Sequence, residues 1–325
     1  MNKLLTISIL ILGLLPLELS AQQRPQYTQY ATNQFLLNPA IAGSQNMDEI
    51  KIGGRVQWIG FEDAPQTVFA TYHAPFKKMP FQNTMNQRGH HGFGAILIKD
   101  ITGPISQTSA HLNYAYHHPF TSNLSASVGA SLGILQHTID MDQLSFQNSN
   151  DVIIDRILPN RFIPDGSIGI WVYSDKFYFG ASITQMISNT TMFLPTGERE
   201  VEVFDLEAHY FANIGYKFDI GQENSDWFLV PSVLFKSVRP SSGHVDFNIR
   251  AQKADNFWFG GSFRQDDSFS GLVGFSAMQD FAFTYSYDFI ISDIGPYSGG
   301  SHELTMTFKF KKKQRKVICP DSFWL

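Results

Sequence analysis

The alternation of side chains near the end of this sequence constrains its fold more than any other feature. From 280 to 289 aromatic residues alternate with small or polar ones, and a similar pattern returns from 303 to 310 after a glycine-rich stretch. Successive side chains of an extended strand point to opposite faces, so both segments predict strands with one apolar and one polar face. A soluble β-sandwich and a membrane β-barrel both fit such strands.

Composition and strand length favour the barrel. Charged residues make up 16% and aromatic residues 14% of the 325 residues, whereas a soluble globular protein has roughly 25% charged residues. The mean hydropathy of -0.13 argues against a helical membrane protein. The run from 123 to 137 alternates throughout, and it is longer than the roughly five or six residues of an ordinary strand. A sandwich would also leave many apolar positions without a core to fill.

We therefore predict an all-β fold, a transmembrane antiparallel β-barrel of about 14 strands with an irregular N-terminal segment and a short C-terminal tail. As the last hairpin, the two segments described above must pair with the first strand to remove the sheet edges. The irregular stretches 138–162 and 189–200 are the expected outer loops, because bacterial barrels place long loops outside. The expected strands are 50–61, 65–76, 91–99, 105–120, 123–137, 163–174, 176–188, 201–220, 226–238, 244–253, 256–264, 268–278, 280–290 and 301–310.

Aromatic residues near the ends of these strands predict the girdles that barrels place at the two membrane interfaces. They are Trp58, Phe61, Phe76, Phe120, Trp171, Tyr173, Phe177, Trp227, Phe257 and Tyr287.

The first 21 residues have the features of a signal peptide. Lys3 gives a positive start, and residues 4–15 form an apolar run that is too short to span a bilayer comfortably. Small residues at Ser20 and Ala21 predict cleavage before Gln22, and no cysteine follows this site to accept a lipid anchor. We therefore expect the mature protein to be exported.

The mature chain divides into three expected parts. Residues 22–49 are rich in Gln, Asn and Tyr without helical or strand periodicity, so we expect an ordered, irregular segment and a candidate plug inside the barrel. Residues 50–311 form the barrel, and residues 312–325 form a periplasmic tail. An even number of strands after signal cleavage predicts both termini on the periplasmic side.

No catalytic constellation stands out, so we expect no enzyme, no cofactor and no metal site. His90-His91 and His117-His118 are adjacent pairs, and each pair points only one imidazole into the lumen. No cysteine or carboxylate cluster completes a zinc site, and no hydrolase motif frames a nucleophile. The formal net charge of -5 gives no sign of nucleic-acid binding.

Motifs at both ends resemble those of a known family. The segment QYTQYATNQFLLNPAIAGS, the strand IKIGGRVQWIGFEDAPQTVFATYHAPF and the closing YSYDFIISDIGPYSGGSHELTMTFKF resemble the corresponding parts of the PorP/SprF family. Two departures are Thr28, where Ser is more usual, and the insertion of 321–322 between the tail motifs. The matching motif residues are Gln29, Tyr30, Asn38, Pro39, Gly43, Arg55, Gln57, Trp58, Gly60, Pro65, Cys319 and Pro320.

This resemblance implies an outer-membrane barrel of the type IX secretion system of Bacteroidetes-type bacteria. It implies a role in secreting or attaching a large exported protein, such as a gliding adhesin, with the outer-membrane lipid bilayer as its surroundings. The implied partners are the exported surface protein or its C-terminal domain, and periplasmic or lipoprotein components of the secretion machinery. A passive porin or small-solute transporter is the alternative that the same architecture allows.

The basic tail offers a docking segment for a periplasmic partner, since charge steers an encounter and aromatic area anchors it. A solvated end beside the membrane is the alternative. The candidate partner-binding residues are Lys311, Lys312, Lys313, Arg315, Lys316, Phe323 and Trp324.

Overall fold

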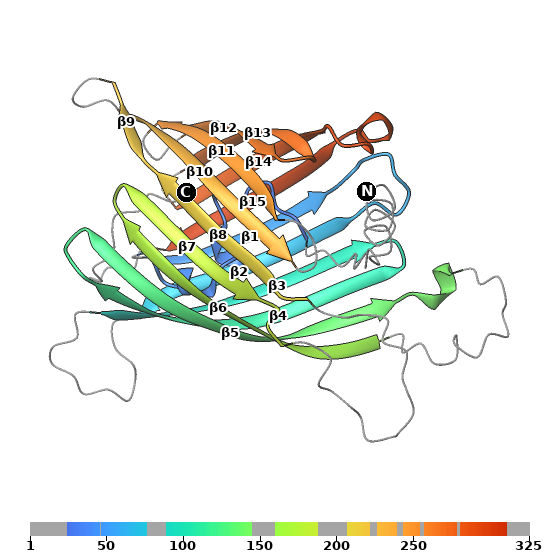
Figure 1. The fold of residues 1–325 in the computed structure, drawn as a ribbon, viewed down its shortest axis with the longest axis horizontal. Coiled ribbons are helices and arrows are strands. Elements are labelled where there is room, and N and C mark those ends of the chain that lie inside the picture. The colour runs from blue at the N-terminus through green and yellow to red at the C-terminus, as the bar shows by residue number, and fades with distance from the viewer. Residues whose placement is uncertain are drawn as a thin grey trace, which may run out of the picture.

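The protein folds into a single antiparallel sheet that closes on itself, as a computed structural model shows (Figure 1). The structure describes residues 25–45, 47–76, 89–144, 160–187, 207–221, 226–238, 243–253, 257–277 and 280–310. Among these residues, no helix is long and apolar enough to cross a membrane.

The strands follow one another around the sheet, and each pairs with its neighbours in the chain, except that β8 and β9 both pair with β10. Their bounds are β1 (Asp48–Val56), β2 (Gln66–Phe76), β3 (His90–Thr102), β4 (Ile105–Pro119), β5 (Leu124–Ile139), β6 (Asn160–Ser174), β7 (Phe177–Thr184), β8 (His209–Tyr216), β9 (Phe218–Ile220), β10 (Trp227–Val238), β11 (His244–Lys253), β12 (Phe257–Arg264), β13 (Ser268–Ala277), β14 (Phe281–Ile290) and β15 (Ser301–Phe310). Short 3-10 helices are η1 (Gln34–Leu36), η2 (Pro39–Ile41), η3 (Met141–Gln143) and η6 (Gly295–Tyr297).

Two pairings close the barrel and confirm the predicted architecture. β1 pairs with β15, from Asp48 opposite Phe310 to Val56 opposite His302. β8 and β9 both pair with β10 and are separated only by Lys217, so they form one interrupted strand. Counting them together gives a closed barrel of 14 strands, as the alternation and chain length predicted.

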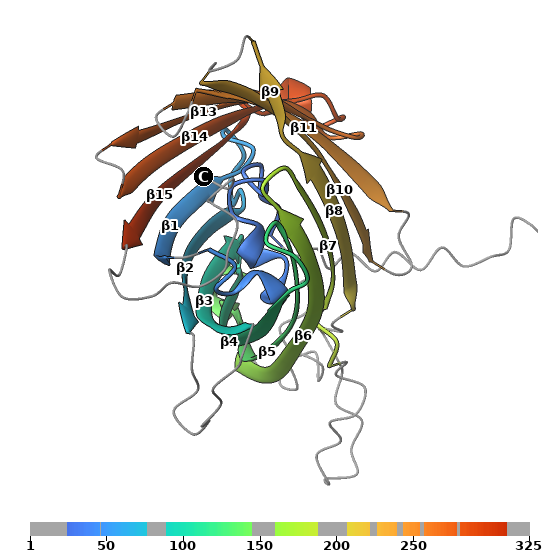
Figure 2. The same ribbon diagram turned by 90° about the vertical axis from the view of Figure 1, so that its left-hand side faces the viewer.

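The predicted inside-outside alternation is present on the wall. In β14, Phe283 is 38% exposed while its neighbour Thr284 is 3% exposed. In β5, Leu132 is 71% exposed and Ser131 is 5% exposed. Exposing such leucines to water would forgo about 1.5–3 kcal/mol for each side chain, so the outer surface suits a lipid environment. The inner surface is polar, and residues 25–45 cover part of it (Figure 2).

Two details differ from the expectations. The first strand ends at Val56 rather than Phe61, because Trp58 takes a positive φ of 46° and turns the chain away. Trp171 and Tyr173 do not join an interfacial girdle but are 1% exposed. The apolar residues of β6 that face outward occupy the alternate positions, so these two aromatic rings point into the lumen.

The barrel has two distinct ends. The loop end carries the connections after β1, β3, β5, β7, β10, β12 and β14, and the terminal end carries the start of β1 and the end of β15. Residues 25–45, which we call the luminal segment, lie inside the barrel within the curve formed by β1 to β7 (Figure 2).

Candidate functional site

The luminal segment is the candidate functional site, because the contents of a barrel decide what can pass through it. Its residues from Tyr27 to Gln45 are buried, except for the half-buried Ala31. Successive turns fold it, including a hydrogen bond from Thr32 N to Gln29 O of 3.0 Å. The Asn38 side chain accepts from Ala40 N at 2.9 Å and caps η2, in which Pro39 occupies the first turn. Asn and Pro suit these two positions because one offers a capping oxygen and the other a preset φ.

An ionic cluster near the loop end holds the start of the luminal segment. Arg55 Nη2 lies 2.6 Å from Asp288 Oδ2, and Arg55 Nη1 lies 3.4 Å from Glu303 Oε2. Thr28 joins all three: its amide donates to Glu303 at 2.7 Å, its hydroxyl donates to Asp288 at 2.8 Å, and Arg55 donates to that hydroxyl at 2.7 Å. We call Arg55, Asp288 and Glu303 the loop-end anchor. These side chains are at most 1% exposed, so each charge depends on the others for compensation.

Gln29 extends this cluster onto the last two strands. Its Nε2 donates to Glu303 O at 2.8 Å, and its backbone amide donates to Glu303 Oε1 at 3.3 Å. Its Oε1 accepts from the Thr284 hydroxyl. The Gln29 side chain therefore bonds to both β14 and β15, which gives glutamine a structural role at this motif position.

A second charged cluster lies on β10, β11 and the turn after β12. Lys236 Nζ lies 2.8 Å from Asp246 Oδ2, and Arg264 Nη1 lies 2.8 Å from Asp267 Oδ2. Arg264 also donates to Tyr27 O at 3.4 Å. Tyr30 donates its hydroxyl to Asp246 O at 3.4 Å. This cluster therefore binds Tyr27 and Tyr30 from the β10 to β12 side of the barrel, whereas the loop-end anchor binds Thr28 from β1, β14 and β15.

At the terminal end, two histidines receive the other end of the segment. His117 Nε2 lies 2.7 Å from Ala42 O, and His90 Nε2 lies 2.9 Å from Gly43 O. The two rings are stacked with centroids 4.5 Å apart. The expectation that one imidazole of each pair faces the lumen is confirmed, and these imidazoles bond carbonyl groups. The described residues contain no group of three or more His, Cys, Asp or Glu side chains suited to a metal.

Glycines on the wall allow the backbone of the segment to approach closely. A Cβ at Gly129 of β5 would lie 2.5 Å from Ala40 N, and a Cβ at Gly92 of β3 would collide with the Ala42 carbonyl group. Any other residue at these positions would therefore displace the segment. Ser127 Oγ donates to Ala40 O at 2.6 Å beside the first contact.

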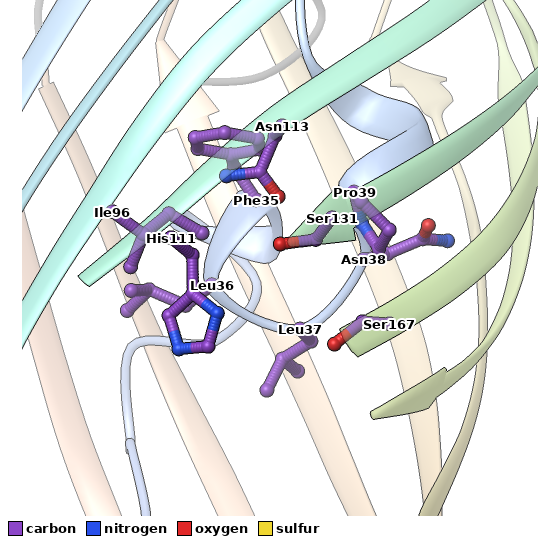
Figure 3. Close-up of a pocket in the computed structure, with 10 residues that line it drawn as sticks. All are labelled: Phe35, Leu36, Leu37, Asn38, Pro39, Ile96, His111, Asn113, Ser131 and Ser167. Carbon is purple, nitrogen blue, oxygen red and sulfur yellow. The ribbon is translucent and has the colours of Figure 1, made fainter. Parts of the chain in front are cut away.

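The segment leaves little space against the wall formed by β3 to β6. A cavity there has a volume of about 20 Å³, which is room for about one water molecule, and Figure 3 shows the side chains that line it. The side chains around it come from the segment and from facing strands: Phe35, Leu36, Leu37, Asn38, Pro39, Ile96, His111, Asn113, Ser131 and Ser167. A larger cavity of about 340 Å³ lies near the loop end, between the start of the segment and β8 to β12.

The structure brings six of the ten described motif residues into this region. Gln29, Tyr30, Asn38, Pro39 and Gly43 belong to the luminal segment, and Arg55 holds it. The other described motif residues form the connection between β1 and β2 and are Gln57, Trp58, Gly60 and Pro65. Gln57 N donates to Pro65 O at 2.9 Å, and Trp58 N donates to Ser301 Oγ at 3.2 Å.

The remaining predicted residues lie outside the part of the chain that the structure describes. They are the predicted signal peptide, Cys319, Pro320 and the candidate docking residues Lys311, Lys312, Lys313, Arg315, Lys316, Phe323 and Trp324. The sequence analysis did not identify roles for Asp288, Glu303 or Arg264. Each of these three residues is a charged side chain at a lumen-facing position of an alternating strand. A charge in such a position needs a partner, and this feature of the sequence could have identified them.

We expected both ends of the mature chain on one side of the membrane. The first described residues lie at the other end of the barrel from the two ends of the wall. The ends of the wall, Asp48 and Phe310, are paired at the terminal end. Pro25 and Gln26, in contrast, line the larger cavity together with Trp58 and Asp266 of the loop end. The luminal segment therefore traverses the barrel before β1 begins, and an even strand count does not fix the position of such a segment.

Comparisons with known proteins give distant structural likenesses and one family. The chain is similar to a FadL homologue of Pseudomonas aeruginosa, with a TM-score of 0.48, 9% identity, and 90% of this chain and 95% of that chain covered. It is also similar to the outer membrane protein Omp33 of Acinetobacter baumannii, with a TM-score of 0.45 and 10% identity. This match covers 81% of this chain and 99% of that chain. No curated protein is a significant match. Residues 19–308 match a family described as type IX secretion system membrane protein PorP/SprF.

Proposed function

Because this chain belongs to the PorP/SprF family of type IX secretion system membrane proteins, we propose that it is a non-enzymatic barrel of the outer membrane that assists type IX secretion. Its task is to help secrete a large exported protein, such as a gliding adhesin, or to attach that protein to the cell surface. The filled lumen is the observation that supports this role over that of a passive porin.

A passive porin needs an open aqueous channel. Here the luminal segment is bonded at the loop end through Thr28 and at the terminal end through Ala42 and Gly43. Between these points, the cavity beside residues 35–39 holds about 20 Å³. A gap of this size does not pass sugars or amino acids, so the packing around residues 35–39 supports a closed barrel rather than an open pore.

The closed pairing and the apolar outer surface of the wall support a location in the outer membrane. A closed barrel satisfies every backbone donor and acceptor between strands, which is what a lipid environment requires. Exposed apolar residues cover the outside, as with Leu112 at 73% exposure. In bacterial barrels the long loops face outward and the chain ends of the wall face the periplasm, so we assign the loop end to the cell surface.

Purification from native membranes tests the secretion role. A tagged full-length protein should recover a large exported protein or its C-terminal domain, together with periplasmic components. The matched control is the same tagged protein from cells in which the type IX pathway is blocked, where the exported protein should be absent from the recovered material. Recovery of the barrel alone from both strains would count against the proposal.

Single-channel conductance tests the porin alternative. The purified protein in planar bilayers should show no large, steady open state. A stable conductance typical of a wide aqueous pore would instead favour small-solute transport.

The tail is proposed as the periplasmic docking segment. Its basic residues would steer an encounter with an acidic partner, and its terminal aromatic residues would anchor the contact. Deleting residues 312–325 should reduce co-purification of periplasmic components while leaving the barrel folded. Unchanged secretion and co-purification after this deletion would remove the tail from the proposal.

A further inference from the structure

The cavity of about 340 Å³ near the loop end is too large to be a packing defect. The cavities beside residues 35–39 and beside Ile98 and Leu135 measure about 20 and 10 Å³. We call the larger space the loop-end cavity. Ligand sites in proteins begin at about 300 Å³, so the loop-end cavity has room for a small ligand but not for a folded domain.

Trp58 reaches this cavity through an unusual backbone conformation. In β1 the side chains of Lys51 and Arg55 are buried in the lumen, whereas those of Ile52 and Val56 are exposed on the outside. Continued alternation would turn Trp58 outward, towards lipid. Trp58 instead takes a φ of 46° and lines the loop-end cavity. A bulky residue pays free energy for a positive φ, and such strain gathers at functional sites.

Hydrogen bonds on both sides hold this strained residue in place. Trp58 N donates to Ser301 Oγ at 3.2 Å, and Trp58 O accepts from Phe61 N at 3.1 Å. The next residue, Ile59, donates its amide to Gly300 O at 2.9 Å. The connection between β14 and β15 therefore fixes the indole beside the cavity before any ligand arrives. A side chain that is already ordered loses little conformational entropy on binding.

The charged side chains around the cavity are compensated by one another or by water. Lys236 Nζ lies 2.8 Å from Asp246 Oδ2, and Arg264 Nη1 lies 2.8 Å from Asp267 Oδ2. Asp266, the remaining charged lining residue, is exposed to solvent. A ligand with a formal charge would bring an uncompensated charge into a partly buried space. The cavity therefore suits an uncharged ligand.

Aromatic rings and uncharged polar side chains form much of the remaining wall. His209 and Phe211 lie two residues apart on β8, with their ring planes 17° apart and their centroids separated by 6.3 Å. Such rings pack on apolar C–H surface. The uncharged side chains able to form hydrogen bonds are Gln26, Ser237, His244 and Gln265.

A pyranose sugar matches this combination, because it has an apolar C–H face, a ring of hydroxyl groups and no formal charge. A hydrocarbon would make no use of the polar groups. Peptide recognition commonly uses a sheet edge or an extended groove, whereas this space lies inside the barrel between the luminal segment and β8 to β12.

We propose that the loop-end cavity binds an uncharged sugar unit, with the Trp58 indole packed on its C–H face. The rings of His209 and Phe211 provide a second apolar contact, and the uncharged polar side chains bond the hydroxyl groups. The sugar is either the end of a glycan chain carried by the outer leaflet or a free sugar, since both present the same chemistry. This inference does not depend on the secretion role, because it concerns only the wall of the cavity.

Titration with neutral sugars tests the proposal. The protein is purified from outer membranes into nanodiscs without lipopolysaccharide, because glucoside and maltoside detergents carry sugar head groups that would compete. Methyl glucoside, methyl galactoside, methyl mannoside, maltose and lactose are added in turn, and binding is followed by saturation-transfer NMR and by tryptophan fluorescence. At least one of these sugars should bind saturably. Glucuronate, a charged counterpart, should bind more weakly.

Substitutions in the wall assign the binding to this cavity. Trp58→Asn removes the indole and places a residue that tolerates positive φ, and it should weaken binding by about two- to tenfold, the range of one aromatic contact. Phe211→Ala should have a similar effect. The matched control is Tyr210→Ala, which removes the adjacent ring of β8 on the outside of the barrel, where it is 38% exposed; binding should not change. Heat-modifiable electrophoretic mobility shows that each variant remains folded.

The same titrations contain the results that would overturn the proposal. They are the absence of saturable binding by every neutral sugar, binding by glucuronate alone, and equal affinities in Trp58→Asn, Phe211→Ala and the unsubstituted protein. Shielding of Trp58 from acrylamide quenching by an added exported protein, but by no sugar, would overturn it and assign the cavity to a peptide. Lipopolysaccharide added to the nanodisc separates the two sources: competition with the free sugar supports a membrane glycan, and its absence supports a free sugar at the same site.

Discussion

Replacing Arg55 by alanine should release the luminal segment without dismantling the barrel wall. The substitution removes both ion pairs of the loop-end anchor and the hydrogen bond to the Thr28 hydroxyl. Asp288 and Glu303 would then remain as two buried carboxylates that have lost the arginine bonded to both. Removing one partner of a buried ion pair costs about 3–5 kcal/mol. The backbone pairing of β1 with β2 and β15 does not involve the Arg55 side chain.

That loss acts on the equilibrium between the docked and released segment. Each 1.4 kcal/mol is a tenfold change, so the released population should rise by roughly a hundred- to several-thousandfold. Native-state amide hydrogen exchange of the peptide covering 27–33 measures this opening, because exchange reports local unfolding. Planar bilayers should also show transient conductance that the native protein lacks.

Three further variants separate the effect of the Arg55 charge from that of the guanidinium geometry and from any general effect of a substitution in β1. Arg55→Lys keeps the charge but not the forked geometry, so it should give an intermediate effect. Arg55→Met with Asp288→Asn and Glu303→Gln removes the buried charges together and should recover much of the loss. Ile52→Ala, at an outward position of the same strand, should leave exchange at 27–33 unchanged. Exchange in Arg55→Ala that matched the native rate would refute the assignment of Arg55 as an anchor.

Three other substitutions test the remaining features of the structure. Gly129→Val should expose residues 38–42 to exchange because a side chain there meets the backbone of the segment, whereas Gly271→Ala, which meets nothing within 4 Å, should be neutral; equal effects would contradict the close approach. Leu132→Arg places a charge on the lipid-facing side and should lower folding stability in bilayers by up to about 2–4 kcal/mol, measured by urea titration; no loss would place that face away from lipid. Lys176→Ala breaks an exposed pair with Asp219 and should leave the urea midpoint nearly unchanged, because water screens exposed ion pairs; a clear loss in the same titration would show that the pair has a structural role.

The alternation of side chains predicted the wall because burial and strand geometry act on each residue locally. Phe283 and Thr284 take the sides that their polarity requires in lipid and in the lumen. The pairing of the first strand with the last was predictable for a different reason, since a barrel has no free edge. Neither argument needs any knowledge of what fills the lumen.

The side chains that bind the segment were harder to predict. Asp288 and Glu303 could be assigned to the lumen by parity, but their pairing with Arg55 depends on the register of β1 against β15 and on the path of the segment. Trp171 and Tyr173 were assigned to an interface because aromatic rings are common there. Their inward direction follows from the alternation of β6, and inside the barrel Trp171 stacks on Tyr178 with ring centroids 5.0 Å apart.

The contacts of the luminal segment link its docking to the closure of the barrel. Thr28 bonds Glu303 across 275 positions of sequence, and Glu303 lies opposite Arg55 in the pairing that closes β1 on β15. Arg55 and Glu303 therefore belong both to the final seam of the wall and to the loop-end anchor that holds the segment. A wall that closed first would leave Glu303 and Asp288 without the hydrogen bonds that Thr28 and Gln29 donate, and it would require the segment to thread a completed ring. A segment that docks as the seam forms avoids both penalties, so closure and filling of this barrel are best understood as one cooperative step.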